Sequence, residues 1–130
     1  MTIINKVNGV NGIYNEAGLQ VEGSLAPNLN GLSPKELLEA SLGLCISISL
    51  QKMFERDNIV VEDKDISIEV TAVKGANSPS HFEKFDVSIA FPDHFSDEYK
   101  KKLIISVDRA CTIGNTLKNS VAIQTIEQAK

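Results

Sequence analysis

Residues 33–56 form the segment that most limits how this chain can fold. Ser33 is a suitable N-cap, Pro34 suits the first helical position, and Glu36 completes a Ser-x-x-Glu capping box, so a helix is predicted from here to about Arg56. Between residues 40 and 50 the helix has no charged side chain, and its only polar ones are Ser41, Ser47 and Ser49. A helix that is apolar on nearly every side is buried on nearly every side. A monomer of 130 residues usually leaves one helix face in water, so dimerisation around this helix is the simplest expectation.

The rest of the chain is predicted to form short strands and a second helix. Apolar alternation and turn residues predict strands at 2–14, around 19–21, at 66–74, at 84–91 and at 121–126. Turns or loops are expected at 15–18, 26–34 and 75–83. Ser96 is a suitable N-cap for a helix that continues to about residue 110, before a turn or short helix at 114–119. This order indicates an α+β fold with helices packed against antiparallel sheet.

Length and composition exclude several classes of protein. A chain of 130 residues is expected to form a single domain over residues 1–130. A net charge of -4 disfavours nucleic-acid binding, because such proteins present a basic surface. The apolar runs are shorter than a membrane span needs, and the first residues do not resemble a signal peptide. We therefore expect a cytoplasmic protein with no membrane partner and no structural disulfide framework.

Cys45 and Cys111 are the only thiols, and they leave two interpretations open. Cys45 lies about three turns inside the first helix, where the helix dipole has little effect and apolar surroundings raise the pKa of a thiol. Cys111 follows a helix-like segment and precedes flexible residues, which is a partly accessible setting. Free cysteines are commonly buried and inert, so the pair is either two core thiols or a redox couple. Their separation of 66 positions cannot decide between these.

Other kinds of site find little support. His81 and His94 lie in separate predicted loops without the spacing of zinc ligands, and no segment matches a Cys/His protease signature. The glycines do not form a phosphate-binding loop. No metal or cofactor is therefore expected.

Two segments resemble motifs of the OsmC/Ohr family. SPKELLEASLGLC (33–45) keeps the family's Pro and, eleven positions later, its Cys, here Pro34 and Cys45. RACTIGNTLK (109–118) resembles the second motif, in which a cysteine precedes a small or polar stretch with Asn. The order of strands and helices agrees over nearly the whole chain.

The resemblance implies a fold and a chemistry. The fold would be an intertwined homodimer in which antiparallel sheets wrap two long central helices. The activity would be reduction of organic hydroperoxides, in which Cys45 attacks as a thiolate and becomes a sulfenic acid, and Cys111 resolves it as a disulfide. A dithiol reductant, lipoylated in some members, would restore the enzyme.

The chain departs from the family pattern around the reactive cysteine. Family peroxidases pair this cysteine with an arginine from the N-terminal region, held by a glutamate directly after the motif proline. Here the only arginines are Arg56 and Arg109, both after Cys45, and the residue after the proline is Lys35. Arg56 is about 16 Å along the same helix from Cys45, too far to serve. Without a cation, Cys45 is expected to stay largely protonated near neutral pH.

Two residues remain as possible supports for the thiols. Glu36 is one position beyond the family glutamate, and its role as capping-box partner is the simpler explanation. Arg109 is two residues before Cys111 and could be recruited by the fold. The missing arginine also leaves two alternatives open: a non-enzymatic dimer that binds a small hydrophobic molecule near Cys45, and a purely structural dimer with inert thiols.

Overall fold

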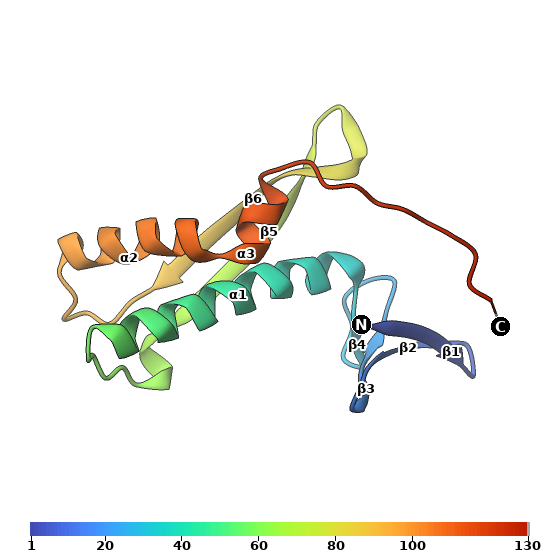
Figure 1. Cartoon of the computed structure of the whole chain (residues 1–130), viewed down its shortest axis with the longest axis horizontal. Helices are drawn as coiled ribbons and strands as arrows, with labels where there is room; N and C mark the ends of the chain where they lie inside the picture. Colours follow the sequence, from blue (N-terminus) through green and yellow to red (C-terminus); the bar gives the residue numbers. More distant parts are fainter. Residues whose placement is uncertain (130) are drawn as a thin grey trace. The chain divides into compact units, whose positions relative to one another are not determined.

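The computed structural model describes residues 1–129, with the side chains of all except residues 78 and 79. Its elements follow the α+β order expected from the sequence (Figure 1). The chain forms two compact units: residues 1–43 with 69–88, and residues 44–68 with the chain from residue 89 onward.

The first unit begins with a four-stranded sheet in the order β1-β2-β3-β4. The strands are β1 (Ile3–Val7), β2 (Val10–Asn15), β3 (Gly18–Gly23) and β4 (Gly31–Leu32). The sequence predicted a single strand at 2–14, paired through the 15–18 turn with the strand around 19–21, but Asn8 and Gly9 both have positive φ, at 52° and 80°, and make a further two-residue turn between Val7 and Val10. Asn-Gly favours this turn because both residues tolerate left-handed backbone. The N-terminus is therefore a three-stranded antiparallel meander, to which the short β4 adds in parallel.

The helix predicted from residue 34 to about residue 56 is confirmed as α1 (Pro34–Arg56). The capping box forms as expected: Glu36 N–H donates to Ser33 Oγ at 3.2 Å, and Ser33 N–H donates to Glu36 Oε1 at 2.9 Å. At the other end, Asn58 takes the left-handed conformation (φ 55°) and Ile59 N–H donates to the Phe54 carbonyl at 2.9 Å. Both helix ends are thus closed by local hydrogen bonds.

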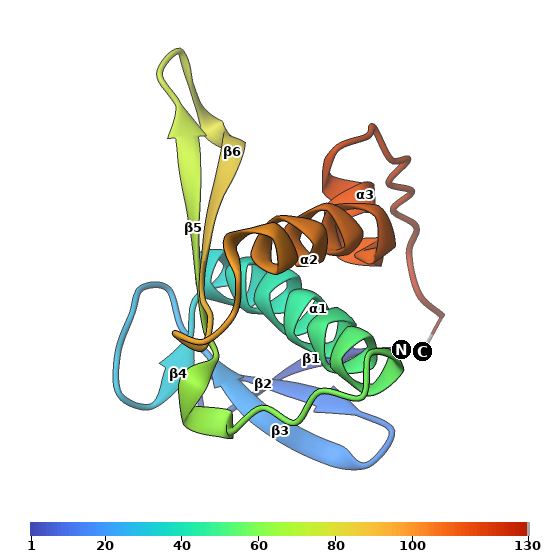
Figure 2. The ribbon, with the colours of Figure 1, turned by 90° about the vertical axis from the view of Figure 1, so that its left-hand side faces the viewer.

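A 3₁₀ turn, η1 (Asp63–Asp65), leads from α1 into the hairpin of β5 (Ser67–Gly75) and β6 (Ser78–Ala90), which Figure 2 shows edge-on. The loop predicted at 75–83 is wrong, because a turn at residues 76 and 77 already returns the chain. Backbone pairing continues through polar residues when both strands are long, and a pattern of polar side chains does not show this. On α1, Glu39 Oε2 accepts hydrogen bonds from Ala72 N–H of β5 at 2.8 Å and from Lys35 Nζ at 2.9 Å.

The second unit continues with α2 (Asp97–Ala110) and α3 (Thr112–Leu117). Ser96 caps α2 as predicted, since its Oγ accepts from Tyr99 N–H at 3.1 Å. The helix α3 starts two residues earlier than the predicted 114–119 segment. The strand predicted at 121–126 is wrong: these residues have no regular secondary structure in the described chain, and Ile123 and Ile126 are exposed. A strand needs a neighbour to bond with, and an alternating pattern cannot supply one.

In the second unit, α2 lies alongside the second half of α1 in both views (Figures 1 and 2). The residues buried there come from both helices and the preceding loop: Ile46, Leu50, Met53, Phe54, Phe95, Leu103 and Val107. The opposite side of α1 is open, with Leu44 62% and Ile48 45% exposed. The expectation that α1 is buried nearly all round is therefore not met within one chain. By length and composition α1 could cross a membrane, as can the core helix of a soluble protein.

Candidate functional site

Cys111 occupies the junction between α2 and α3. Its N–H donates to the Val107 carbonyl at 2.9 Å, which closes α2, and its Sγ accepts from Gly114 N–H at 3.3 Å, which caps α3. The residue is 2% exposed. One buried cysteine therefore ends one helix and begins the next.

Cys45 lies in the middle of α1 and is partly exposed. Its thiol interacts with that of Cys111, although 66 positions separate the two residues in the sequence. The residues that follow Cys111 also act on Cys45, because the N–H groups of Thr112 and Ile113 lower the pKa of its thiol. Both cysteines are free thiols in this structure. The fold brings together the two residues that the sequence singled out.

The pKa values of the two thiols are shifted in opposite directions. The Ile113 N–H has the largest effect on Cys45 and lowers its pKa, with further lowering by Cys111, the Thr112 N–H and the charge of Lys52, against a raising effect of burial. Burial raises the pKa of Cys111, and the neighbouring Cys45 raises it further. The sequence predicted a raised pKa for Cys45, so that expectation is wrong. The expectation failed because the thiolate form of Cys45 is stabilised by the backbone N–H groups of Ile113 and Thr112, which are far from Cys45 in the sequence.

The pKa shifts make the two thiols unequal. Cys45 loses its proton more readily than Cys111, and the thiolate is the reactive form of a cysteine. Cys111 is buried and keeps its proton to higher pH than Cys45 does. The pair can therefore perform thiol–disulfide chemistry in which the two cysteines have different roles.

The other charged candidates lie elsewhere or are already engaged. Glu36 is held in the capping box of α1. Arg56 Nε pairs with Asp57 Oδ1 at 3.0 Å. The Arg109 carbonyl accepts a hydrogen bond from Asn115 Nδ2 at 3.0 Å. The Arg109 guanidinium is not among the groups that shift the pKa of Cys45. Sequence reasoning missed Lys52, although its position seven residues after Cys45 puts it on the same helix face.

A second polar contact lies at the opposite end of this helix pair. Tyr99 Oη donates to Asp57 Oδ2 at 2.8 Å, beside the ion pair of Arg56 with Asp57. Arg56 and the Tyr99 hydroxyl lower the pKa of Asp57 to about 2, while burial and the Asp57 carboxylate raise the pKa of Tyr99 to about 12. Phe95 packs edge-on against Phe54 and Tyr99 beneath this contact, with ring centroids 5.8 and 5.1 Å apart.

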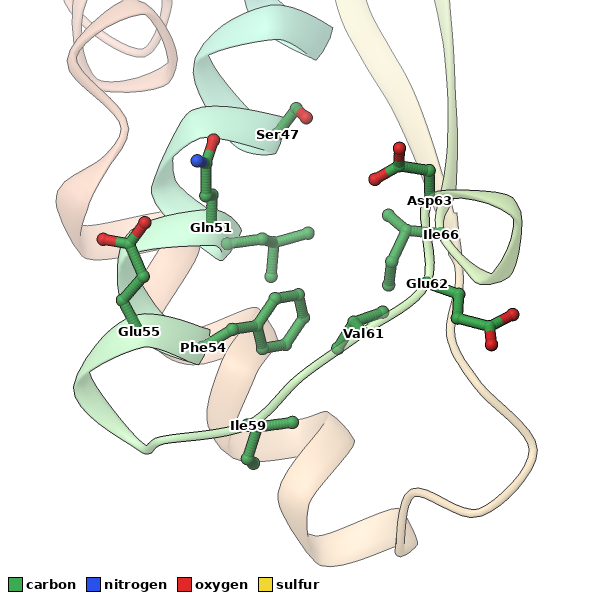
Figure 3. A pocket seen from close by; sticks show the side chains of 10 residues that line it. Ser47, Gln51, Phe54, Glu55, Ile59, Val61, Glu62, Asp63 and Ile66 are labelled. Atoms are coloured by element: carbon green, nitrogen blue, oxygen red, sulfur yellow. The ribbon is translucent and has the colours of Figure 1, made fainter.

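A cleft of about 510 Å³ lies between the second half of α1 and the segment that follows it (Figure 3). Apolar residues form much of its lining: Leu50, Phe54, Ile59, Val61 and Ile66. The other residues that line it are polar: Ser47, Gln51, Glu55, Glu62 and Asp63. Neither cysteine lines this cleft. Among the described residues, no group of three or more His, Cys, Asp or Glu side chains could hold a metal ion.

Comparisons with known proteins agree with the fold. The sequence profile of the family described as OsmC-like protein matches residues 26–126. No curated protein sequence matches the chain significantly. An OsmC-like protein from Mycoplasma pneumoniae has a similar structure, with TM-score 0.71, 16% identity, and coverage of 91% of this chain and 84% of that one.

Two further similar structures are those of organic hydroperoxide resistance proteins. The organic hydroperoxide resistance protein OhrB of Bacillus subtilis matches with TM-score 0.62 and 18% identity, over 91% of this chain and 90% of that one. An organic hydroperoxide resistance protein OsmC from Legionella pneumophila matches with TM-score 0.64 and 17% identity, over 91% and 89%. At such low identity these similarities show the fold alone.

Proposed function

Because the chain belongs to the OsmC-like protein family, we propose that it reduces organic hydroperoxides with Cys45 as the nucleophile and Cys111 as the resolving thiol. One observation carries this proposal: the only two thiols of the chain interact, with the pKa of the partly exposed Cys45 lowered and that of the buried Cys111 raised. Two inert thiols in a core would not be expected to have pKa values shifted in opposite directions.

The reaction balances in three steps. The Cys45 thiolate attacks the terminal oxygen of the hydroperoxide, the O–O bond breaks, and the alkoxide leaves as an alcohol after taking a proton. Cys45 is now a sulfenic acid. The Cys111 sulfur attacks it, so that a disulfide forms and water leaves with the Cys111 proton. A dithiol reductant then exchanges with the disulfide, becomes oxidised itself, and returns both cysteines to thiols.

The active form is proposed to be a homodimer. Leu44 and Ile48 on α1 are apolar and exposed, directly beside Cys45, and water is an unfavourable neighbour for such side chains. A second copy would bury them and would complete the surroundings of the thiol. We place this dimer in the cytoplasm as a soluble protein, with α1 as its core helix, and name a dithiol, such as a lipoylated protein, as its reductant. Light scattering should give twice the chain mass of 14.2 kDa.

The test of the chemistry counts thiols after oxidation. Reduced protein is treated with one equivalent of cumene hydroperoxide, denatured and assayed for free thiols. The wild type should lose both thiols per chain and form one intramolecular disulfide. Cys111→Ser should stop at a Cys45 sulfenic acid that dimedone traps, and Cys45→Ser should leave the hydroperoxide unconsumed.

Two outcomes would contradict the proposal. One is a wild-type protein whose thiols survive excess hydroperoxide at every pH between about 6 and 9, a range that brackets ordinary thiol titration. The other is a Cys45→Ser variant that consumes hydroperoxide as fast as the wild type. The cleft of Figure 3 gives no support to the alternative of a ligand site at Cys45, because Cys45 does not line it.

A further inference from the structure

Lys52 lies seven residues after Cys45 on α1. Seven residues complete two helical turns to within about 20°, so the two side chains leave the helix on the same face, with a rise of about 10.5 Å between them. Long side chains on a helix lean toward its N-terminus, which carries the Lys52 ammonium back toward Cys45. Two residues lie between them on this face, Ile48 and Ser49; Ile48 is uncharged, and the Ser49 hydroxyl donates a hydrogen bond to the Cys45 carbonyl at 2.9 Å. No acidic side chain of the helix therefore lies between the ammonium and the thiol.

The charge of Lys52 is not neutralised by a neighbour. Two other lysines form ion pairs with nearby glutamates: Lys35 with Glu39 at 2.9 Å and Lys64 with Glu62 at 3.3 Å. Lys52 forms no ion pair among the described residues, and its side chain is exposed. The groups that face Cys45 from the packed segment are the Cys111 thiol and the N–H groups of Thr112 and Ile113. None of these carries a negative charge that would compete for the ammonium while Cys111 keeps its proton.

We propose that Lys52 is a positioning residue that supplies the positive charge for the Cys45 thiolate, in the role that an N-terminal arginine has in family peroxidases. The inference rests on the proposed function for its purpose, but its electrostatic content can be measured without any hydroperoxide. A cation on the same face, two turns away and unpaired, favours the thiolate over the thiol by direct attraction. It acts through Cys45 and makes no bond to the reacting atoms.

The expected size of the effect is modest. Two exposed charges two helical turns apart interact weakly in a high dielectric, so loss of Lys52 should raise the pKa of Cys45 by about 0.5. Below that pKa the thiolate population should fall about threefold, and the rate of reaction with an alkylating agent should fall with it. Salt should remove the difference, because the Debye length drops from about 10 Å at 0.1 M to about 3 Å at 1 M.

The experiment measures alkylation of Cys45 by iodoacetamide against pH, with the Cys45 peptide quantified separately from the Cys111 peptide by mass spectrometry. Four proteins are compared: wild type, Lys52→Met, Lys52→Arg and Lys101→Met. The last is the matched control, because Lys101 is an exposed lysine of α2 without an ion pair among the described residues and its loss changes the net charge equally. We expect a raised pKa in Lys52→Met alone, a wild-type value in Lys52→Arg, and convergence of all four at 1 M salt.

Two results would overturn the proposal. Equal pKa values for Lys52→Met and wild type at low salt would show that the ammonium does not act on Cys45. Equal rises in Lys52→Met and Lys101→Met would show an effect of net charge alone. A folding defect would appear as a changed circular dichroism spectrum and would not be rescued selectively by arginine. If instead the proposed function fails, the wild-type thiols ignore hydroperoxide while the pKa difference persists.

Discussion

The second unit joins α1 to the α2–α3 segment at two points that use different chemistry. At one, Tyr99 and Asp57 form a hydrogen bond beside an ion pair and over a cluster of aromatic rings. At the other point, the thiols of Cys45 and Cys111 interact, and the backbone N–H groups of Thr112 and Ile113 also act on the Cys45 thiol. The first contact combines charge and packing and has one stable form. The second contact can exist as two thiols or as a disulfide, so it is the one able to change with redox conditions.

The difference suggests that the unit separates stability from reactivity. A site whose bonds must form and break gains from being supported elsewhere, because its own contacts cannot be optimised for one state. The Tyr99–Asp57 end is expected to hold α2 against α1 while the thiols change state. The following predictions test this separation, beginning with the largest effect.

Replacing Phe95 by alanine should break the stable end. Its ring lies 5.1 to 6.1 Å from those of Phe54, Phe91, His94 and Tyr99, and the side chain is 8% exposed. Loss of a buried ring leaves a cavity, so the free energy of unfolding in urea should fall by about 3 to 5 kcal/mol. Phe85→Ala is the control, because that ring has a single aromatic neighbour, Phe82. Equal losses in the two variants would show that the cluster has no special role.

Replacing Tyr99 by phenylalanine should weaken the same end without opening a cavity. The ring stays while the 2.8 Å hydrogen bond to Asp57 is lost, and a partly exposed bond to a carboxylate contributes about 1 kcal/mol. The urea midpoint should fall, and the alkylation rate of Cys45 should stay at the wild-type value. Tyr14→Phe, at the only other tyrosine, should leave the midpoint nearly unchanged. A change in Cys45 reactivity would contradict the separation of the two ends.

Alkaline and acid titrations should sharpen the comparison further. Burial and the Asp57 carboxylate raise the pKa of Tyr99 to about 12 from the ordinary 10.0, so this contribution to stability is complete below pH 10 and is lost as the pH rises through 12. The pKa of Asp57 is lowered to about 2 from 3.8, so its contribution is present above pH 3.8 and is lost as the pH falls through 2. The absorbance of the ionised phenol should report the titration of Tyr99. The Asp57→Asn substitution should lower the pKa of Tyr99. A Tyr99 pKa unaffected by Asp57→Asn would mean that the carboxylate is not the partner.

Some elements of the fold could be predicted from the sequence and others could not. The limits of α1 and α2 could be predicted because Ser33 and Ser96 cap their helices through bonds within four residues. The missed Asn8–Gly9 turn was also local, and the positive φ values of both residues are what its composition favours. The failures at 75–83 and 121–126 concern strands, whose existence depends on a partner that the pattern of one segment does not contain.

The site divides along the same line. The identity of both cysteines followed from flanking motifs, but the direction of the pKa shift of Cys45 did not. Its main cause is the Ile113 N–H, a group that every residue except proline carries and that no sequence pattern distinguishes. The contact that matters joins positions far apart in the chain, so only the fold could reveal it.

The smallest effect should appear at the reactive end. Diamide can convert the two thiols to a disulfide without hydroperoxide. The Cys111 sulfur, once bonded to Cys45, becomes a poorer acceptor for Gly114 N–H, and α3 loses its cap. Loss of a cap lowers the stability of a helix by about 0.5 to 1 kcal/mol, so hydrogen exchange of the Gly114 amide should accelerate about two- to fivefold. The Tyr99 amide, capped by Ser96 Oγ in the same way, is the internal control. Unchanged exchange at Gly114 would show that α3 does not sense the disulfide.

The hydrogen bond from Ala72 of β5 to Glu39 has a consequence for behaviour at high protein concentration. A strand with free amides at its edge is a template on which another chain can add, and natural sheets guard such edges with charge. Glu39 already occupies the Ala72 amide and is itself held by Lys35, so an incoming strand would have to displace a carboxylate before it could bond there. At this position the helix thereby guards the edge of the hairpin against addition of a strand from another chain.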